Sequence, residues 1–167
     1  FFVGANYWHG SLLGREKDEH RGVERLRSEL DLLKRLGITN LRVLAGAEGE
    51  GLLNGITRVG PPLQPAKGKF DEGALKSLDL LLAEMRKRDM RAVVYLSNNW
   101  EWSGGFQQYL LWEKRIDPTL TTRKPSWDEL RDTVKEFYTC SPCIAAYQTQ
   151  AAKVFSRRNS ITLVEYV

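Results

Sequence analysis

The sequence predicts an α/β fold in which three strand–helix units follow one another along the chain. Short apolar runs alternate with longer segments whose apolar residues recur at helical spacing. This alternation implies parallel strands joined by right-handed crossovers. The apolar runs are nearly uninterrupted by polar residues, as expected when both faces of a parallel sheet are covered.

Three apolar runs are the expected strands, at residues 1–6, 40–45 and 91–96. Each is short enough for a strand and is followed by turn-forming or polar residues. A further apolar run, "ITLVEYV" at residues 161–167, fits either a fourth strand or a frayed tail.

Three amphipathic segments are the expected helices. The first contains "HRGVERLRSELDLLKRLG", and the second starts after a capping Asp71. The third starts at a capping box formed by Ser126 and Glu129, and a further helical stretch reaches about residue 158. The apolar residues at helical spacing are Val23, Leu26, Leu30 and Leu33; Leu75, Leu78, Leu82 and Met85; and Trp127, Leu130, Val134 and Phe137.

The lengths of the connections indicate which edge of the sheet carries function. The helix-to-strand connections "LGIT" and "KRDM" are short, whereas two strand-to-helix connections, residues 46–70 and 97–125, far exceed the usual length. Neither long connection shows a clear periodicity, so we expect irregular structure in both. They leave the carboxyl ends of the strands, which is where α/β barrels and open α/β sheets bind their ligands.

Composition narrows the class of protein. The 167 residues are 42% hydrophobic and 28% charged, which is typical of a soluble globular domain with one sizeable core. The net charge of +4 is spread over the helices without a basic stripe, so nucleic acid is not an expected partner. No apolar run approaches the roughly 20 residues of a membrane span, so no membrane association is expected.

No metal or cofactor is expected. His9 and His20 are the only histidines, and no ligand cluster accompanies either. Cys140 and Cys143 form a C-x-x-C motif, but a closed zinc site needs about four ligands. A redox motif of this type should follow a strand, whereas these cysteines follow an amphipathic helix.

Several blocks are specific enough to carry a family resemblance. They include "LRVLAG", "NNWEWSGG" and "FYTCSPCIAAYQTQAAKVFSRRNSIT", and the likeness runs from Phe1 to about Thr162. In these blocks the chain resembles endo-β-1,4-mannanases of glycoside hydrolase family five. The resemblance implies a partial (β/α)8 TIM barrel, its first three βα units, so that residues 1–167 are the N-terminal part of a glycoside hydrolase catalytic domain. A complete barrel needs about 250 residues.

The resemblance implies a secreted, endo-acting glycosidase that cleaves mannan, glucomannan or galactomannan by a retaining double displacement. The family's acid/base Glu lies in an Asn-Glu-Pro motif at the end of strand four, and its nucleophile Glu ends strand seven. No Asn-Glu-Pro occurs in this sequence, so neither carboxylate carries over and the isolated chain is expected to be inactive. Glu48, Glu50 and Glu101 are loop carboxylates, but a catalytic pair must lie about 5 to 5.5 Å apart and we expect no complete pair.

One site residue of the family does carry over, because the Arg at the end of strand two corresponds to Arg42. In the family this guanidinium hydrogen-bonds the nucleophile carboxylate, and such a contact lowers the carboxylate's pKa and keeps it ionised. Fungal and plant members often have a Trp two residues later, where this sequence has Leu44.

Aromatic and amide side chains are the candidates for sugar binding. Trp100 and Trp102 offer flat platforms for pyranose rings, and Asn99 offers hydrogen bonds to hydroxyl groups. If this segment is extended, both Trp side chains point to one side, and we expect one of the two to be buried. Glu101, between them, is interpreted as fixing the loop or contacting a sugar hydroxyl. A further group of candidates comes directly at the end of the first strand. By position, these residues either line the sugar-binding cleft or form a packing cluster at its rim: Asn6, Tyr7 and Trp8.

Two alternatives stay open. The residues alone also allow a small open α/β domain with a redox role for its C-x-x-C motif, or with a protein-binding role. The family resemblance instead implies a structural disulfide or buried thiols at Cys140 and Cys143, because related mannanases carry a similar pair there. A partial barrel leaves the edges of its first and third strands unpaired, which favours self-association through those edges.

Overall fold

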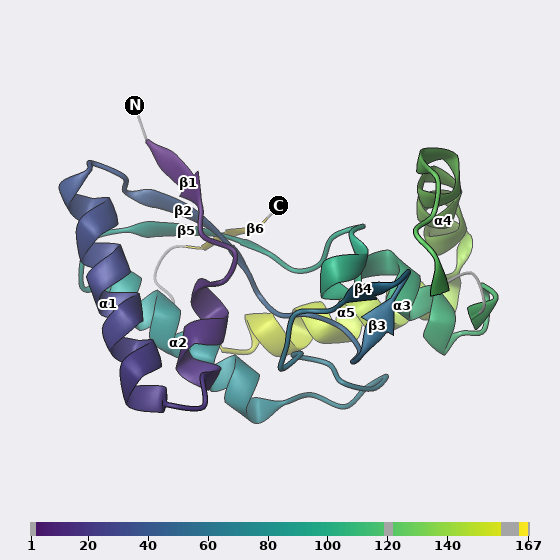
Figure 1. Cartoon of the computed structure of the whole chain (residues 1–167), viewed down its shortest axis with the longest axis horizontal. Coiled ribbons are helices and arrows are strands. Elements are labelled where there is room, and N and C mark those ends of the chain that lie inside the picture. Colours follow the sequence, from purple (N-terminus) through teal and green to yellow (C-terminus); the bar gives the residue numbers. More distant parts are fainter. Residues whose placement is uncertain (1–2, 119–121, 158–163, 167) are drawn as a thin grey trace. The chain divides into compact units, whose positions relative to one another are not determined.

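The computed structural model describes residues 3–118, 122–157 and 164–166 (Figure 1). The chain divides into two compact units of similar size. The first, here called the sheet unit, comprises residues 1–45, 72–96 and 154–167. The second, here called the loop unit, comprises residues 46–71 and 97–153 and so contains both long strand-to-helix connections.

The sheet unit contains a parallel sheet with the strand order β1-β2-β5-β6. This arrangement confirms the three expected strands and their parallel direction. The C-terminal run, which the sequence left open between strand and tail, contains a strand that pairs parallel with β5. The edges of the described sheet are therefore β1 and β6, not the first and third strands as expected. The strands are β1 Gly4–Asn6, β2 Asn40–Leu44, β5 Arg91–Tyr95 and β6 Val164–Tyr166.

Helices cover one face of this sheet. The helices are α1 Glu19–Arg35 and α2 Glu72–Arg86, which pack against each other and against the short 3-10 helix η1 Gly10–Arg15 (Figure 1). Helix α1 starts where the Asp18 side chain accepts a hydrogen bond from the Arg21 N–H, two residues before the expected start. Burial alternates over the first four residues of β2 and of β5, as on a pleated strand covered on one face, and the last residues, Leu44 and Tyr95, are buried as well. The buried strand residues of this face are Leu41, Val43, Ala92 and Val94.

The loop unit contains regular structure that the sequence did not lead us to expect. A hairpin joins β3 Leu52–Leu53 to β4 Ile56–Thr57 through Asn54 and Gly55, whose φ angles are 53° and 73°. Positive φ at both central residues is the geometry that Asn-Gly adopts most readily, so the expectation of irregular structure at 46–70 was wrong here. The second connection likewise contains the 3-10 helix η2 Glu101–Ser103 and the helix α3 Gly105–Trp112.

Two further helices complete the loop unit, α4 Trp127–Thr139 and α5 Ser141–Phe155. The predicted capping box at the start of α4 is confirmed, because the Ser126 and Glu129 side chains each accept the other's backbone N–H. Cys140 and Cys143 form a disulfide at the junction of the two helices.

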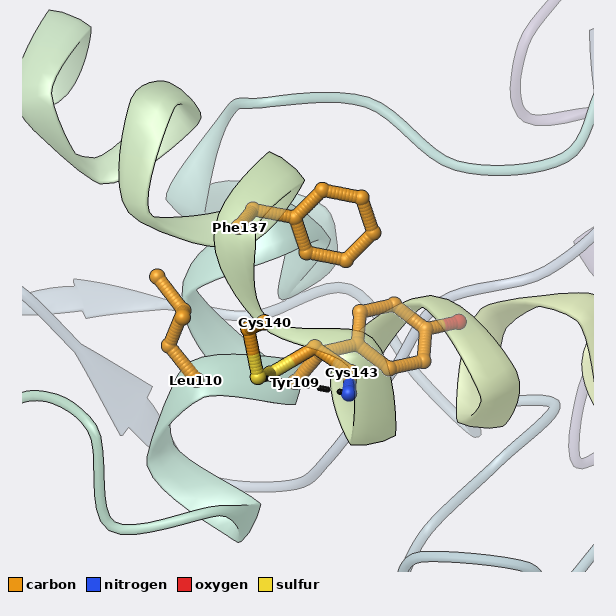
Figure 2. Close-up of a cluster of buried hydrophobic side chains, with 5 residues drawn as sticks. All are labelled: Tyr109, Leu110, Phe137, Cys140 and Cys143. Carbon is orange, nitrogen blue, oxygen red and sulfur yellow. Dashed lines mark hydrogen bonds between the residues drawn. A yellow bond between two sulfur atoms is a disulfide. The ribbon is translucent and has the colours of Figure 1, made fainter.

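The disulfide lies inside a hydrophobic cluster (Figure 2). Both cysteines are at most 1% exposed, and the rings of Tyr109 and Phe137 lie beside them together with Leu110. The Cys143 N–H also donates a hydrogen bond to Cys140 Sγ at 3.3 Å. This burial confirms the structural disulfide and argues against a redox-active motif, because thiol exchange requires access to the sulfur.

A buried carboxyl group connects the elements of the loop unit. Glu48 is fully buried, and its carboxyl oxygens accept hydrogen bonds from the Gly105 N–H, the Tyr109 hydroxyl and the Gln150 amide at 3.1, 3.3 and 2.7 Å. The Gln150 side chain in turn accepts a hydrogen bond from the Gln64 side chain at 2.8 Å. Burial raises the pKa of Glu48 to about 7, although these hydrogen bonds oppose the shift.

We predict that Glu48 makes the stability of the chain depend on pH. Its folded pKa of about 7 exceeds the reference value of 4.5, so the folded state binds more protons between these values. The stabilisation is therefore complete below pH 4.5 and is lost as pH rises through 7, by about 3 kcal/mol. In urea unfolding at pH 5 to 8, Glu48→Gln should remove this loss of stability. Glu50→Gln, at an exposed site, should keep it; an unchanged slope in Glu48→Gln would contradict the prediction.

We also predict that the disulfide stabilises the loop unit modestly. The bond joins two residues with a sequence separation of 3. Closing so short a loop lowers the conformational entropy of the unfolded chain, which raises the free energy of unfolding by about 2 kcal/mol. The double variant Cys140→Ser, Cys143→Ser should lower the free energy of unfolding by this amount, as measured by urea titration without reductant. Adding reductant during unfolding of the native chain should reproduce the loss, and equal midpoints for both proteins would refute it.

Candidate active site

Arg42 is the central candidate of the sheet unit. It lies in β2 directly beside Asn6 of β1 and Val93 of β5. Its neighbours Leu41 and Val43 are buried on the helix-covered face, whereas Arg42 is exposed and so projects from the opposite face. Its guanidinium carbon lies 3.9 Å from the centre of the Tyr95 ring, which is close enough for a cation–π contact.

The residues at the end of β1 and directly after it separate into two environments. Tyr7 is 5% exposed, and its hydroxyl donates a hydrogen bond to Glu29 of α1 at 2.5 Å. Burial and this contact raise the pKa of Tyr7. Its backbone N–H donates to the Arg42 carbonyl at 2.8 Å, so the side chain of Tyr7 fits the packing interpretation. Asn6 and Trp8 are both exposed and stay candidates for substrate contact.

The aromatic loop forms a tight turn rather than an extended strand. The Asn98 carboxamide oxygen accepts hydrogen bonds from the Trp100 N–H at 2.6 Å and from the Ser103 hydroxyl at 2.9 Å, which holds the segment as the 3-10 helix η2. Trp100 precedes η2 and Trp102 lies within it, so this segment is not the extended strand on which both Trp side chains were expected to share a side. Trp100 is 47% exposed and Trp102 is partly exposed, so the expectation that one would be buried was wrong.

In this loop, buried side-chain oxygens without a hydrogen-bond partner within the described ranges include Glu101 Oε2 and Asn99 Oδ1. Glu101 is 5% exposed as a whole, whereas Asn99 is half-buried. Buried polar atoms that lack partners are uncommon in folded proteins, and they occur at sites that bind a further group. Both residues therefore remain candidates for supporting a substrate.

The loop carboxylates have different environments. Glu48 is committed to the core of the loop unit by its three hydrogen bonds, so it fits a structural role and not that of a reacting acid. Glu50 is exposed. The predicted site residues are divided between the sheet unit, with Asn6, Tyr7, Trp8 and Arg42, and the loop unit, with Asn99, Trp100, Glu101 and Trp102.

Metal-binding clusters and membrane-spanning helices are both absent from the described residues. In the part of the chain that the structure describes, no group of three or more His, Cys, Asp or Glu side chains is placed to bind a metal ion. Across the same residues, every helix is too short or too polar to cross a membrane.

The sequence of this chain is similar to those of plant mannan endo-1,4-beta-mannosidases. Mannan endo-1,4-beta-mannosidase 7 of Oryza sativa subsp. japonica is 36% identical over 76 residues, which are 46% of this chain and 20% of the relative. Mannan endo-1,4-beta-mannosidase 5 of Arabidopsis thaliana is 34% identical over 105 residues, which are 62% of this chain and 22% of the relative. The matched segments thus span about one fifth of these relatives.

Solved structures of related enzymes share the fold. The glycoside hydrolase family 5 mannosidase from Rhizomucor miehei matches with a TM-score of 0.81 and 33% identity, covering 97% of this chain and 40% of that chain. The hyperthermostable endo-1,4-beta-D-mannanase from Thermotoga petrophila RKU-1 matches with a TM-score of 0.64 and 18% identity, covering 99% of this chain and 44% of that chain. At that identity the second match supports the fold alone.

A family model covers the chain from end to end. The model describes GH family 5 beta-mannosidase-like proteins and matches residues 1–167. Together with the structural matches, it confirms the resemblance found in the sequence and the α/β fold of a partial barrel. The chain belongs to the glycoside hydrolase family 5 beta-mannosidase-like family.

Proposed function

We propose that this chain is the N-terminal part of the catalytic domain of an endo-acting mannanase. The domain would cleave β-1,4-mannosidic bonds in mannan, glucomannan or galactomannan by a retaining double displacement. The observation that carries this proposal is the family match over residues 1–167, joined to an exposed Arg42 on the open face of the sheet. Plant relatives named as mannan endo-1,4-beta-mannosidases support the substrate class.

Arg42 has a defined role in this proposal. The contact with the Tyr95 ring holds its guanidinium on the open face of the sheet. There it would donate hydrogen bonds to the nucleophile carboxylate of the complete enzyme and lower the pKa of that group. The ionised form is the one that attacks the anomeric carbon, while the acid/base partner stays protonated. The sugar contacts would come from Asn6, Trp8, Asn99, Trp100, Glu101 and Trp102.

The location and assembly of the protein are part of the proposal. A disulfide forms and persists in oxidising compartments, which supports secretion. The chain covers 40% of the Rhizomucor miehei mannosidase and contains no Asn-Glu-Pro, which supports the view that both catalytic carboxylates lie outside it. With β1 and β6 as the edges of its described sheet, the isolated chain would self-associate through these strands.

We predict that hydrolysis requires more than these 167 residues. The complete protein of the same reading frame should release reducing sugar from glucomannan and should cut mannohexaose internally, whereas the 167-residue chain should release none. The assay is reducing-sugar release with chromatography of the products. Stepwise release of mannose from mannohexaose would replace the endo assignment by an exo one, and hydrolysis by the pure 167-residue chain would contradict the fragment proposal.

We predict that Arg42→Lys in the complete protein lowers kcat on the order of a hundredfold, because a lysine cannot reproduce the planar guanidinium contact. The acidic limb of the pH–rate profile should move to higher pH, since the nucleophile loses part of what lowers its pKa. KM should change little. The matched control is Arg91→Lys. Arg91 is the first residue of β5, at the end of the strand away from its carboxyl end, so this variant should behave like the unsubstituted enzyme. An unchanged acidic limb in Arg42→Lys would exclude the proposed role.

A further inference from the structure

Trp127 is the most exposed aromatic side chain among the described residues. Its position in the apolar stripe of the third expected helix predicted a contact with the core, but it is 71% exposed. Its ring centre lies 6.1 Å from that of Trp100, and the two rings are tilted by 41°. Trp100 is itself 47% exposed. Two adjacent Trp side chains with this exposure are unusual on a monomer and indicate a binding surface.

Local hydrogen bonds within the loop unit hold the backbone at both Trp residues. Trp127 is the first residue of α4, and the capping box of Ser126 and Glu129 fixes the backbone there. Arg123 donates a hydrogen bond to the same Glu129 carboxylate at 3.0 Å, which ties the preceding segment to the helix start. On the other side, the Asn98 carboxamide holds the Trp100 N–H at 2.6 Å. The backbone positions from which both rings project are therefore fixed before any ligand binds.

We propose that Trp100 and Trp127 form a sugar-stacking platform that adds a subsite for a β-1,4-linked mannan chain. This inference rests on the proposed function and assigns a substrate contact to Trp127, which no sequence pattern suggested. Trp100 belongs to the predicted substrate loop, so the platform continues that loop onto the start of α4. The platform would give the enzyme a preference for longer chains.

The chemistry of the patch favours a polysaccharide as its occupant. A pyranose ring presents an apolar face to an aromatic ring and a rim of hydroxyl groups to polar neighbours. The start of α4, which carries Trp127, also carries the charged groups of Asp128 and Arg131, which pair with each other at 3.1 Å, and such groups suit a sugar rim better than a purely apolar partner.

The test is calorimetric titration of the 167-residue chain and its variants with mannopentaose. Trp127→Ala should weaken binding about fivefold to tenfold, as expected for loss of one aromatic stacking contact. Trp100→Ala should weaken it similarly, and Trp127→Phe should retain most of the affinity because a stacking surface remains. The matched control is Tyr138→Ala, which removes an equally exposed aromatic of α4 that contacts Phe106 and Phe137 instead of Trp100.

The outcomes separate this inference from the proposed function. Equal affinity of Trp127→Ala and the unsubstituted chain would overturn the platform, and so would absence of mannopentaose binding by the unsubstituted chain. Neither result bears on mannan hydrolysis by the complete protein, which is the test of the proposed function. Near-ultraviolet circular dichroism and the urea midpoint establish that each variant is folded, as expected for a side chain that is 71% exposed.

Discussion

The loop unit depends on one buried carboxyl group, that of Glu48. Its carboxyl oxygens accept hydrogen bonds from groups far along the chain. These include the backbone N–H of Gly105 and the side chain of Gln150, which is 102 residues away from Glu48 in the sequence. The two glycines that end "NNWEWSGG" lie where the backbone passes close to neighbouring carbonyl groups. A Cβ at Gly104 would lie 2.1 Å from the Glu48 carbonyl oxygen, and one at Gly105 would lie 2.3 Å from that of Asn98. The buried carboxyl thus fixes the base of the loop whose outer side presents Trp100.

In the sheet unit, strand pairing positions the Arg42 side chain. Parallel pairing places Asn6, Arg42 and Val93 side by side, so backbone hydrogen bonds alone determine where the guanidinium emerges. Tyr95, two residues beyond Val93 on β5, then supplies the ring against which the cation rests. An arginine held in this way loses little freedom when it meets a carboxylate, which is what the support of a nucleophile requires.

Much of the sheet unit was predictable from sequence, because its signals are local and repetitive. The strands and α2 follow from apolar periodicity. Within the loop unit, the start of α4 was also predictable, from the Ser126–Glu129 capping box. The loop unit was less predictable. Its hairpin has a clear local signal, the Asn54-Gly55 pair. The role of Glu48 has no local signal, because a buried acid in a Gly-rich loop is recognisable only from its distant partners. The pairing of Trp100 with Trp127 is likewise a contact between distant segments.

The proposed function gives this chain a share in a mannanase active site: an arginine that would support the nucleophile and aromatic side chains that would contact the sugar, with the reacting carboxylates supplied from elsewhere in the complete protein. The most direct measurement of this claim is the coding sequence that follows the codon for Val167. An Asn-Glu-Pro within about 30 residues, the approximate length of one βα unit of an eight-unit barrel, is the predicted result. A downstream sequence without that motif would contradict the assignment.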